Sequence, residues 1–344
     1  SEENIIIDVN ELAKDKEFYQ LANWSISPDE NVMAYAEDTN GRRQYSIKFK
    51  YLDTSLTSSY SIKNTSGDMA WSFDGKYLFY VIRDEETLLP YKLYRHEIGT
   101  NQDQDIEVYE EKDDTFYLSV GNTRSMDYIE INISSTTSSE VRLIDSKFPE
   151  TQPEIFLTRE KDHLYSVDHD PSSSRFLVES NWQAINFRLL ETSLENSKDK
   201  GQWKELIPHR EDVLLQSVVP FPNHLVIMER EDGLRNIKIL EKESNSLKSI
   251  NFNDPTYTAY LAANPEYDID RFYFGYSSMR MPDSLFSVKL DSGRKRLLKQ
   301  AEVKGVFSSS DYKVDRKFIT ARDGTSVPVS LVYKRSKFNK NKNP

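Results

Sequence analysis

Two similar stretches, WSISPDENVMAYAED (Trp24–Asp38) and AWSFDGKYLFYVIRD (Ala70–Asp84), decide the fold class of this chain. Each predicts a strand, a tight turn and a second strand, because a short polar segment with Ser and Asp separates two runs rich in β-formers. Each is followed by a further pair of strand-like segments, QYSIKFKYLD and YKLYRHEIG. The repeating unit is therefore four short antiparallel strands.

Weaker copies of this unit continue along the chain. Their turns fall near positions 28, 73, 121, 169, 220 and 264, which gives a period of 44 to 51 residues. Four-stranded antiparallel units at this spacing are typical of the blades of a β-propeller. A pair of β-sandwiches is the alternative, but it gives no reason for six similar periods. We therefore expect an all-β propeller.

Two local elements stand apart from the repeat. ITARDGTSVPVSLVY (Ile319–Tyr333) predicts a hairpin, because Gly324 accepts the positive φ of a tight turn. Its second strand, Val327–Tyr333, has the apolar pattern of a strand buried on both faces. Near the N-terminus, residues 8–19 predict a short helix with Asp8 as N-cap and with Leu12 and Phe18 turned inward.

Composition excludes several classes of function. The 344 residues carry a formal net charge of −11, which argues against a nucleic-acid partner and is compatible with cationic substrates. Cysteine is absent, so disulfides and thiolate metal sites are excluded. The N-terminus has no basic start and only a three-residue apolar run, and no apolar run reaches membrane-spanning length. We expect a cytoplasmic protein without a membrane partner.

The sequence offers no convincing catalytic motif. The string nearest to a Gly-x-Ser-x-Gly nucleophile elbow is GYSSM (Gly275–Met279), which ends in Met. No two histidines have metal-ligand spacing, and His169, between Asp168 and Asp170, is explained more simply by a polar turn. The histidines are His96, His163, His169, His209 and His224. We therefore predict no catalytic residue, no metal site and no cofactor.

One turn is a candidate binding site. Asn40-Gly41 predicts a tight turn between two strands, with Arg42 and Arg43 at its edge. Paired guanidinium groups there could hold a carboxylate of a partner domain or of a peptide. The alternative is a pair of solvated loop charges. Glu17 is a further candidate for a substrate or domain interface, on weaker grounds.

Several longer segments carry a resemblance to a known family. They are YEEKDDTFYLSV (Tyr109–Val120), TLLPYKLYRHEIGT (Thr87–Thr100), TSSEVRLID (Thr137–Asp145), GYSSMRMPDSLF (Gly275–Phe286), LLKQAEV (Leu297–Val303) and ARDGTSVPVSLVY (Ala321–Tyr333). These segments resemble the oligopeptidase B (protease II) branch of the prolyl oligopeptidase family of serine peptidases. They follow one another along the chain in the same order as in that family. The resemblance covers essentially the whole chain.

This resemblance implies a domain organisation. The family has a seven-bladed β-propeller inserted into an α/β-hydrolase domain, and here the first blade is expected to be incomplete. Residues 1–312 then form the propeller, and residues 313–344 are the truncated start of the hydrolase domain, with the C-terminal hairpin as its first element. The family's catalytic Ser, Asp and His and its acidic specificity residues match no part of this sequence, so none is carried over.

The resemblance also implies a function. We expect the gating, substrate-filtering propeller of a serine oligopeptidase that cleaves short peptides after Lys or Arg, inactive as this fragment. Its partners would be an intramolecular α/β-hydrolase domain and, through that domain, short basic peptides. The alternative is a free-standing β-propeller binding module without peptidase activity.

Overall fold

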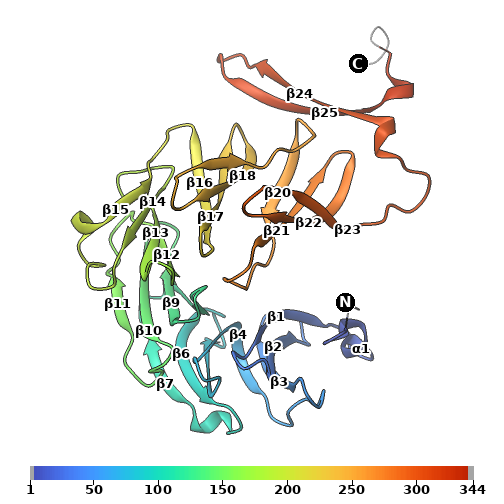
Figure 1. Ribbon diagram of the computed structural model, residues 1–344. Helices are drawn as coiled ribbons and strands as arrows, with labels where there is room; N and C mark the ends of the chain where they lie inside the picture. Colours follow the sequence, from blue (N-terminus) through green and yellow to red (C-terminus); the bar gives the residue numbers. More distant parts are fainter. Residues whose placement is uncertain (1–3, 340–344) are drawn as a thin grey trace. The chain divides into compact units, whose positions relative to one another are not determined.

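Antiparallel strands form nearly all of the regular structure in the computed structural model, which describes residues 4–339 (Figure 1). Helical elements are short: α1 (Val9–Ala13) and the 3-10 turns η1 (Gln102–Gln104), η2 (Lys200–Gln202), η3 (Ser309–Asp311) and η4 (Arg335–Lys337). Within the described range, none of the helices has the length and apolar character needed to cross a membrane. The all-β prediction is confirmed.

The first seven strands form one sheet in chain order. They are β1 (Gln20–Ile26), β2 (Val32–Asp38), β3 (Tyr45–Tyr51), β4 (Ile62–Trp71), β5 (Tyr77–Arg83), β6 (Pro90–Glu97) and β7 (Ile106–Glu110). β4 joins two repeats, because its first half pairs with β3 through Ile62 and Thr65, and its second half pairs with β5. The register shifts between Thr65 and Met69, where Gly67 has a φ of +90°. The first repeat thus has three strands of its own and uses the start of β4 as a fourth.

Four further sheets have four strands each. The first contains β8 (Tyr117–Asn122), β9 (Tyr128–Ser134), β10 (Ser139–Asp145) and β11 (Glu154–Leu157), and the second β12 (Tyr165–Asp170), β13 (Arg175–Ser180), β14 (Arg188–Thr192) and β15 (Lys204–Ile207). The third contains β16 (Val213–Pro220), β17 (His224–Glu231), β18 (Leu234–Glu241) and β19 (Leu247–Ser249), and the fourth β20 (Tyr257–Leu261), β21 (Arg271–Ser278), β22 (Met281–Lys289) and β23 (Lys295–Gln300). With the two repeats in the seven-stranded sheet, the described residues contain six repeats, as the sequence period predicts.

The predicted Ser-x-Asp turns are hydrogen-bonded in the same way in the first two repeats. The Ser27 hydroxyl donates to Asp29 Oδ1 (2.5 Å) and accepts the first N–H of β2 (3.0 Å). The Ser72 hydroxyl donates to Asp74 Oδ1 (2.6 Å) and accepts the first N–H of β5 (2.9 Å). Hydrogen bonds of this kind, from side chains to the nearby backbone, stabilise a tight turn. The repeated sequence therefore encodes a repeated turn.

The chain divides into two compact units, each with its own apolar core. The first is mostly residues 1–169, with 174–178 and 191–204, and the second is mostly residues 205–344, with 170–173 and 179–190. In the first unit, buried side chains of β5 and β6 pack against those of β8 and β9, among them Phe79 and Ile131. In the second unit, β17 and β18 pack against β21 and β22 in the same way, through Val226 and Phe274. Face-to-face packing of successive sheets is the arrangement expected of propeller blades.

The C-terminal hairpin forms as predicted, but its apolar side chains are not covered. β24 (Tyr312–Thr320) pairs with β25 (Ser326–Lys334), and Gly324 at the turn has a φ of +86°. Val327 and Leu331 remain 41% and 42% exposed, so the pattern of a doubly buried strand is not realised here. Arg316 donates to the carbonyl oxygen of Asp232, and few other hydrogen bonds of the described residues anchor the hairpin.

The predicted N-terminal helix is shorter than the sequence indicates. Asp8 is its N-cap and accepts hydrogen bonds from the N–H groups of Asn10 (2.9 Å) and Glu11 (3.4 Å). The helix ends at Ala13, and Asp15 has a φ of +60°, which a right-handed helix does not allow. Phe18 therefore lies beyond the helix and is 41% exposed, so the prediction of a helix reaching residue 19 was wrong.

Candidate binding site

The predicted turn with the two arginines lies between β2 and β3, and the buried carboxylate of Asp38 organises it. Asp38 is 1% exposed and accepts N–H bonds from Asn40 and Gly41 (both 2.9 Å) and from Arg43 (2.8 Å). Gly41 and Arg43 both have positive φ, +74° and +57°. Three bonds to one carboxylate compensate the strain of a non-glycine residue in the left-handed region. The backbone of the turn is therefore fixed while both arginine side chains remain exposed.

The segment that carries Glu17 lies against this turn. A Cβ placed on Gly41 would be 3.7 Å from the ring of Phe18, so that ring covers the glycine. Next to it, Lys16 lies over the ring of Tyr19, with the ammonium 4.3 Å from the ring centroid. Lys16 also pairs with Glu37 on β2, at 4.0 Å. The structure thus brings residues 16–19 and the 38–43 turn to one surface.

The charges of this surface divide into paired and exposed groups. Glu37 is 5% exposed, and Lys48 lies 2.7 Å from it as its close counterion. Burial raises the pKa of Tyr19, and the Glu37 carboxylate raises it further. Among the described residues, by contrast, no carboxylate forms an ion pair with Arg42 or Arg43. The chemistry of the site is that of two accessible guanidinium groups, which suit an anionic group presented from outside.

Replacing Asp38 with Ala should release the turn. Three N–H groups lose their acceptor, but water reaches them at the surface, so we expect a loss of about 1–2 kcal/mol in the free energy of unfolding. Urea denaturation followed by tryptophan fluorescence measures this loss. Asp38→Asn retains one acceptor oxygen and should lose less. Equal stability of wild type and Asp38→Ala would show that the carboxylate does not hold the turn.

The GYSSM string does not form a nucleophile site. Gly275 to Ser278 lie within β21 rather than on a strand-to-helix turn. The Ser278 hydroxyl donates to the buried carboxylate of Asp254 (2.7 Å), which also accepts from Arg280 Nε (2.6 Å). Burial alone would raise the pKa of Asp254, but these hydrogen bonds and the Arg280 charge lower it overall. Ser278 is thus part of a structural ion-pair cluster.

The ring of His169 lies close to a serine and an aspartate of the preceding repeat, whereas the adjacent Asp168 accepts its main-chain N–H (2.8 Å). Its Nδ1 lies 2.9 Å from Ser125 Oγ and 3.3 Å from Asp127 Oδ2. A Ser-His-Asp relay needs the two groups on opposite ring nitrogens, whereas here both approach the same one. The ring also packs against Tyr128 and Phe176, with centroids 5.1 and 5.0 Å apart. This geometry favours a structural role for His169, although the residue lies on strand β12 and not in the predicted polar turn.

Sequence analysis missed an unusual carboxyl group on β9. Burial raises the pKa of Glu130 to about 8, and the nearby charge of Asp168 adds to the effect. Its side-chain partner is Asn132, on the same face of the strand. In the sequence, Glu130 alternates with buried isoleucines as an ordinary surface residue would. No local pattern could have indicated its surroundings, because Asp168 comes from β12.

Groups of three or more side chains that could hold a metal ion are absent from residues 4–339. The observed chemistry of the described residues is that of ion pairs, a carboxylate-organised turn and exposed guanidinium groups. The interface role of Arg42, Arg43 and Glu17 remains a prediction. All three side chains are exposed, but the part of the chain that the structure describes contains no partner for them.

Comparison with known proteins gives concordant matches. The family model described as "Prolyl oligopeptidase, N-terminal beta-propeller domain" matches residues 1–301. Among curated proteins, dipeptidyl aminopeptidase BI of Pseudoxanthomonas mexicana is 36% identical over 338 residues, covering 97% of this chain and 46% of that protein. Protease 2 of Moraxella lacunata is 31% identical over 333 residues, covering 96% of this chain and 47% of that protein. The chain spans about half the length of the curated relatives it matches.

Solved structures agree with these matches. Oligopeptidase B from Leishmania major is similar with a TM-score of 0.88 and 30% identity, over 96% of this chain and 47% of that one. Oligopeptidase B from Trypanosoma brucei, with covalently bound antipain, has a TM-score of 0.88 and 28% identity, over 98% of this chain and 48% of that one. The match covers all the repeats described above.

Proposed function

This chain belongs to the prolyl oligopeptidase family, as its N-terminal β-propeller region, and on that premise we propose that it filters substrates for a serine oligopeptidase that cleaves short peptides after Lys or Arg. The observation that carries the proposal is the family match over residues 1–301, together with identity above 30% to two peptidases. The net charge of −11 supports a preference for cationic peptides, since an acidic surface attracts them.

We further propose that residues 313–344 begin an α/β-hydrolase domain of the same protein, and that residues 1–312 form the propeller. Supporting this division, the exposed apolar side chains of the hairpin include Phe318 (54%), Ile319 (55%) and Leu331 (42%). Exposed apolar faces of this kind are typical of surfaces that pack against another element. A cytoplasmic location, where short peptides arise from protein turnover, completes the proposal.

The specificity can be tested with the full protein and blocked peptide amides. The 36% identical relative is named a dipeptidyl aminopeptidase, so the assay has to separate internal cleavage from removal of N-terminal dipeptides. We expect N-blocked Arg and Lys amides to be hydrolysed, the isosteric citrulline amide to resist, and a serine-directed phosphonate to abolish turnover. A folded protein rich in Lys and Arg should remain intact. Cleavage of unblocked dipeptide amides alone, or of citrulline as fast as arginine, would overturn the proposal.

Arg43 should contribute to substrate affinity or domain closure in the full protein. Exposed ion pairs contribute roughly 0–1 kcal/mol, whereas an interfacial Arg–carboxylate pair contributes more. Arg43→Ala is therefore expected to raise KM several-fold at low salt with little change in kcat, and to leave the melting temperature unaltered.

The matched control is Arg175→Ala, which removes another exposed arginine of the same unit, on β13. It should leave both kinetic constants unchanged. If Arg43→Ala kinetics equal those of the wild type at low salt, where screening is weakest, Arg43 is only a solvated loop charge.

A further inference from the structure

The turn that carries the two arginines also contains the single Asn-Gly pair of the chain, Asn40-Gly41. An asparagine before a glycine can lose its side-chain amide without an enzyme. The main-chain nitrogen of the glycine attacks the side-chain carbonyl carbon, and no Cβ on the glycine hinders the approach. Asn40 and Gly41 are both exposed, so water reaches both. The pair is therefore a candidate site of spontaneous covalent modification.

The nitrogen that attacks in this reaction already donates its hydrogen to a carboxylate. The N–H of Gly41 bonds to Oδ1 of Asp38, with 2.9 Å between nitrogen and oxygen. Asp38 is 1% exposed, so water competes little for its oxygen atoms. A carboxylate at hydrogen-bond distance from the proton to be removed meets the geometric requirement for a general base.

A second hydrogen bond holds the side-chain amide that is attacked. Oδ1 of Asn40 accepts the N–H of Arg42 at 2.9 Å. Negative charge develops on this oxygen when the nitrogen adds to the carbonyl carbon, and a main-chain N–H aimed at the oxygen stabilises that charge. The guanidinium groups of Arg42 and Arg43 add a smaller contribution, because both are exposed and water and salt screen them.

We propose that Asn40 deamidates in the folded protein, with Asp38 as the general base. Asp38 takes the proton of the Gly41 N–H while the bond from Gly41 N to Asn40 Cγ forms. The bond from Cγ to Nδ2 then breaks, and ammonia leaves with that proton, which gives a five-membered succinimide. Water opens this ring at either carbonyl carbon, and the product at position 40 is aspartate or isoaspartate. Water is the only co-reactant.

Either product changes the charge of the arginine turn. The new carboxylate at position 40 can pair with Arg42 or Arg43, which weakens the attraction of both for an anionic group presented from outside. Isoaspartate also lengthens the main chain by one carbon atom, so Gly41 and Arg43 move relative to Asp38. The modification does not depend on the proposed peptidase function, although any effect on substrate affinity does.

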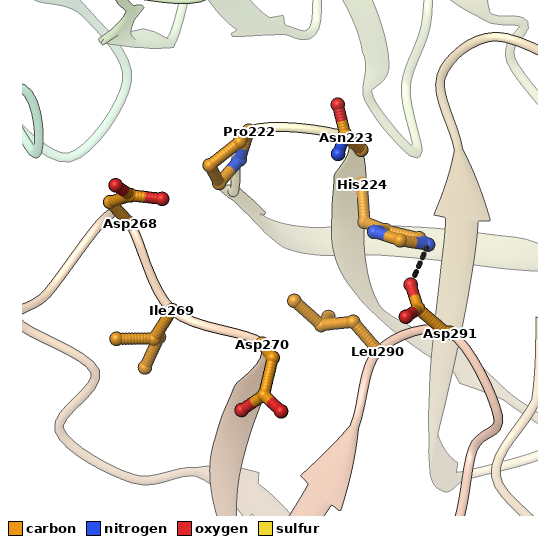
Figure 2. A pocket seen from close by; sticks show the side chains of 8 residues that line it. All are labelled: Pro222, Asn223, His224, Asp268, Ile269, Asp270, Leu290 and Asp291. Carbon is orange, nitrogen blue, oxygen red and sulfur yellow. Dashed lines mark ion pairs between the residues drawn. The ribbon is translucent and has the colours of Figure 1, made fainter.

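Asn223 provides a comparison within the same chain. It is exposed at the β16–β17 turn, and Figure 2 shows it next to His224. The residue after this asparagine is thus a histidine, whose Cβ hinders ring closure and whose side chain is only 5% exposed. We therefore expect Asn223 to stay intact while Asn40 reacts.

The test is incubation of the full protein at pH 8 and 37 °C, after a serine-directed phosphonate has blocked any peptidase site, followed by peptide mapping with mass spectrometry. Deamidation raises the mass of the peptide that contains Asn40 by one dalton, and an isoaspartyl methyltransferase labels the isoaspartate. Asp38→Asn retains a hydrogen-bond acceptor but lacks the basic carboxylate. In this variant, Asn40 should deamidate at least fivefold more slowly than in the wild type.

A synthetic peptide of residues 34–45 is the matched control, because it contains the same residues without a folded turn. In the peptide, Asp38→Asn should not change the rate. The proposal is overturned if Asn40 of folded Asp38→Asn reacts as fast as in the wild type or faster, or if the substitution slows the peptide equally. It is also overturned if Asn223 of the wild type reacts as fast as Asn40, a comparison that needs no variant.

Discussion

Replacing Glu130 with Gln should stabilise the protein by a few kcal/mol at pH 8 and by less than about 1 kcal/mol at pH 5. Burial raises the pKa of Glu130 from its ordinary 4.5 to about 8, and the charge of Asp168 on β12 contributes to the shift. The folded state therefore holds a proton that the unfolded chain releases near pH 4.5. A neutral glutamine keeps the acceptor for Asn132 without a buried charge.

The sign of the pH dependence follows from this shift. Below the unfolded pKa, Glu130 is protonated in both states, and its full contribution to stability is present. As the pH rises towards about 8, the unfolded state gains its charge freely while the folded state resists it, so stability falls. The slope is about 1.4 kcal/mol per pH unit for one proton. Above the folded pKa the penalty is complete and constant.

Urea denaturation of both proteins at pH 5, 6, 7 and 8 measures the difference in unfolding free energy directly. Other groups titrate in the same range, but they cancel in the difference between variant and wild type. Glu195→Gln is the control, because Glu195 is exposed and belongs to the same unit. If the unfolding free energies of wild type and Glu130→Gln change in parallel with pH, Glu130 is charged in the folded protein, and its surroundings are polar enough to hold that charge.

Replacing Gly67 with Ala should destabilise the first unit by about 2–4 kcal/mol, the second large effect. Gly67 has a φ of +90°, which an L-residue with a Cβ adopts only under strain. The added methyl would lie 3.2 Å from Cδ2 of Tyr45 and 3.6 Å from the Cβ of Ala36. Both neighbours belong to the buried core, so neither can easily move. Backbone strain and overpacking therefore both contribute to the expected loss in the free energy of unfolding.

Gly99→Ala separates these two terms. Gly99 has nearly the same φ, +94°, but a Cβ there would meet nothing within 4 Å. Its replacement should lose only the strain, roughly 1–2 kcal/mol. Thermal denaturation of the two variants beside the wild type gives the comparison. Equal losses in both would mean that the Tyr45 ring moves aside at no cost, and that the close contact has no role.

The repeat and its turns could be predicted from sequence because they depend on local chemistry. Ser72 and Asp74 form their hydrogen bonds within one turn, and Gly324 supplies its positive φ without help from distant residues. The predicted length of the N-terminal helix was wrong. The apolar spacing extends to Phe18, but Asp15 has a positive φ, and the helix ends before it. Spacing alone does not report backbone strain.

Sites that depend on distant strands could not be predicted in this way. His169 was singled out for the aspartates beside it, whereas the observed partners of its ring, Ser125 and Asp127, lie in the preceding repeat. Glu130 has the alternation of a surface residue, but burial raises its pKa and the charge of Asp168 on β12 adds to the effect. For the arginine turn, the sequence located Arg43 and its exposure, but not the buried carboxylate of Asp38 that fixes it. A single sequence does not contain these tertiary neighbours.

The strand β4 has a consequence for how the protein opens under thermal fluctuation. Through it, the strands β1 to β7 belong to one hydrogen-bonded sheet that spans two repeats. Sub-global opening follows contiguous cooperative units, so these two repeats should behave as a single foldon. The amide protons of β2 and β5 should then exchange with solvent deuterium with a common opening free energy. β9 belongs to a separate four-stranded sheet of the same unit, so its amide protons are free to have a different opening free energy.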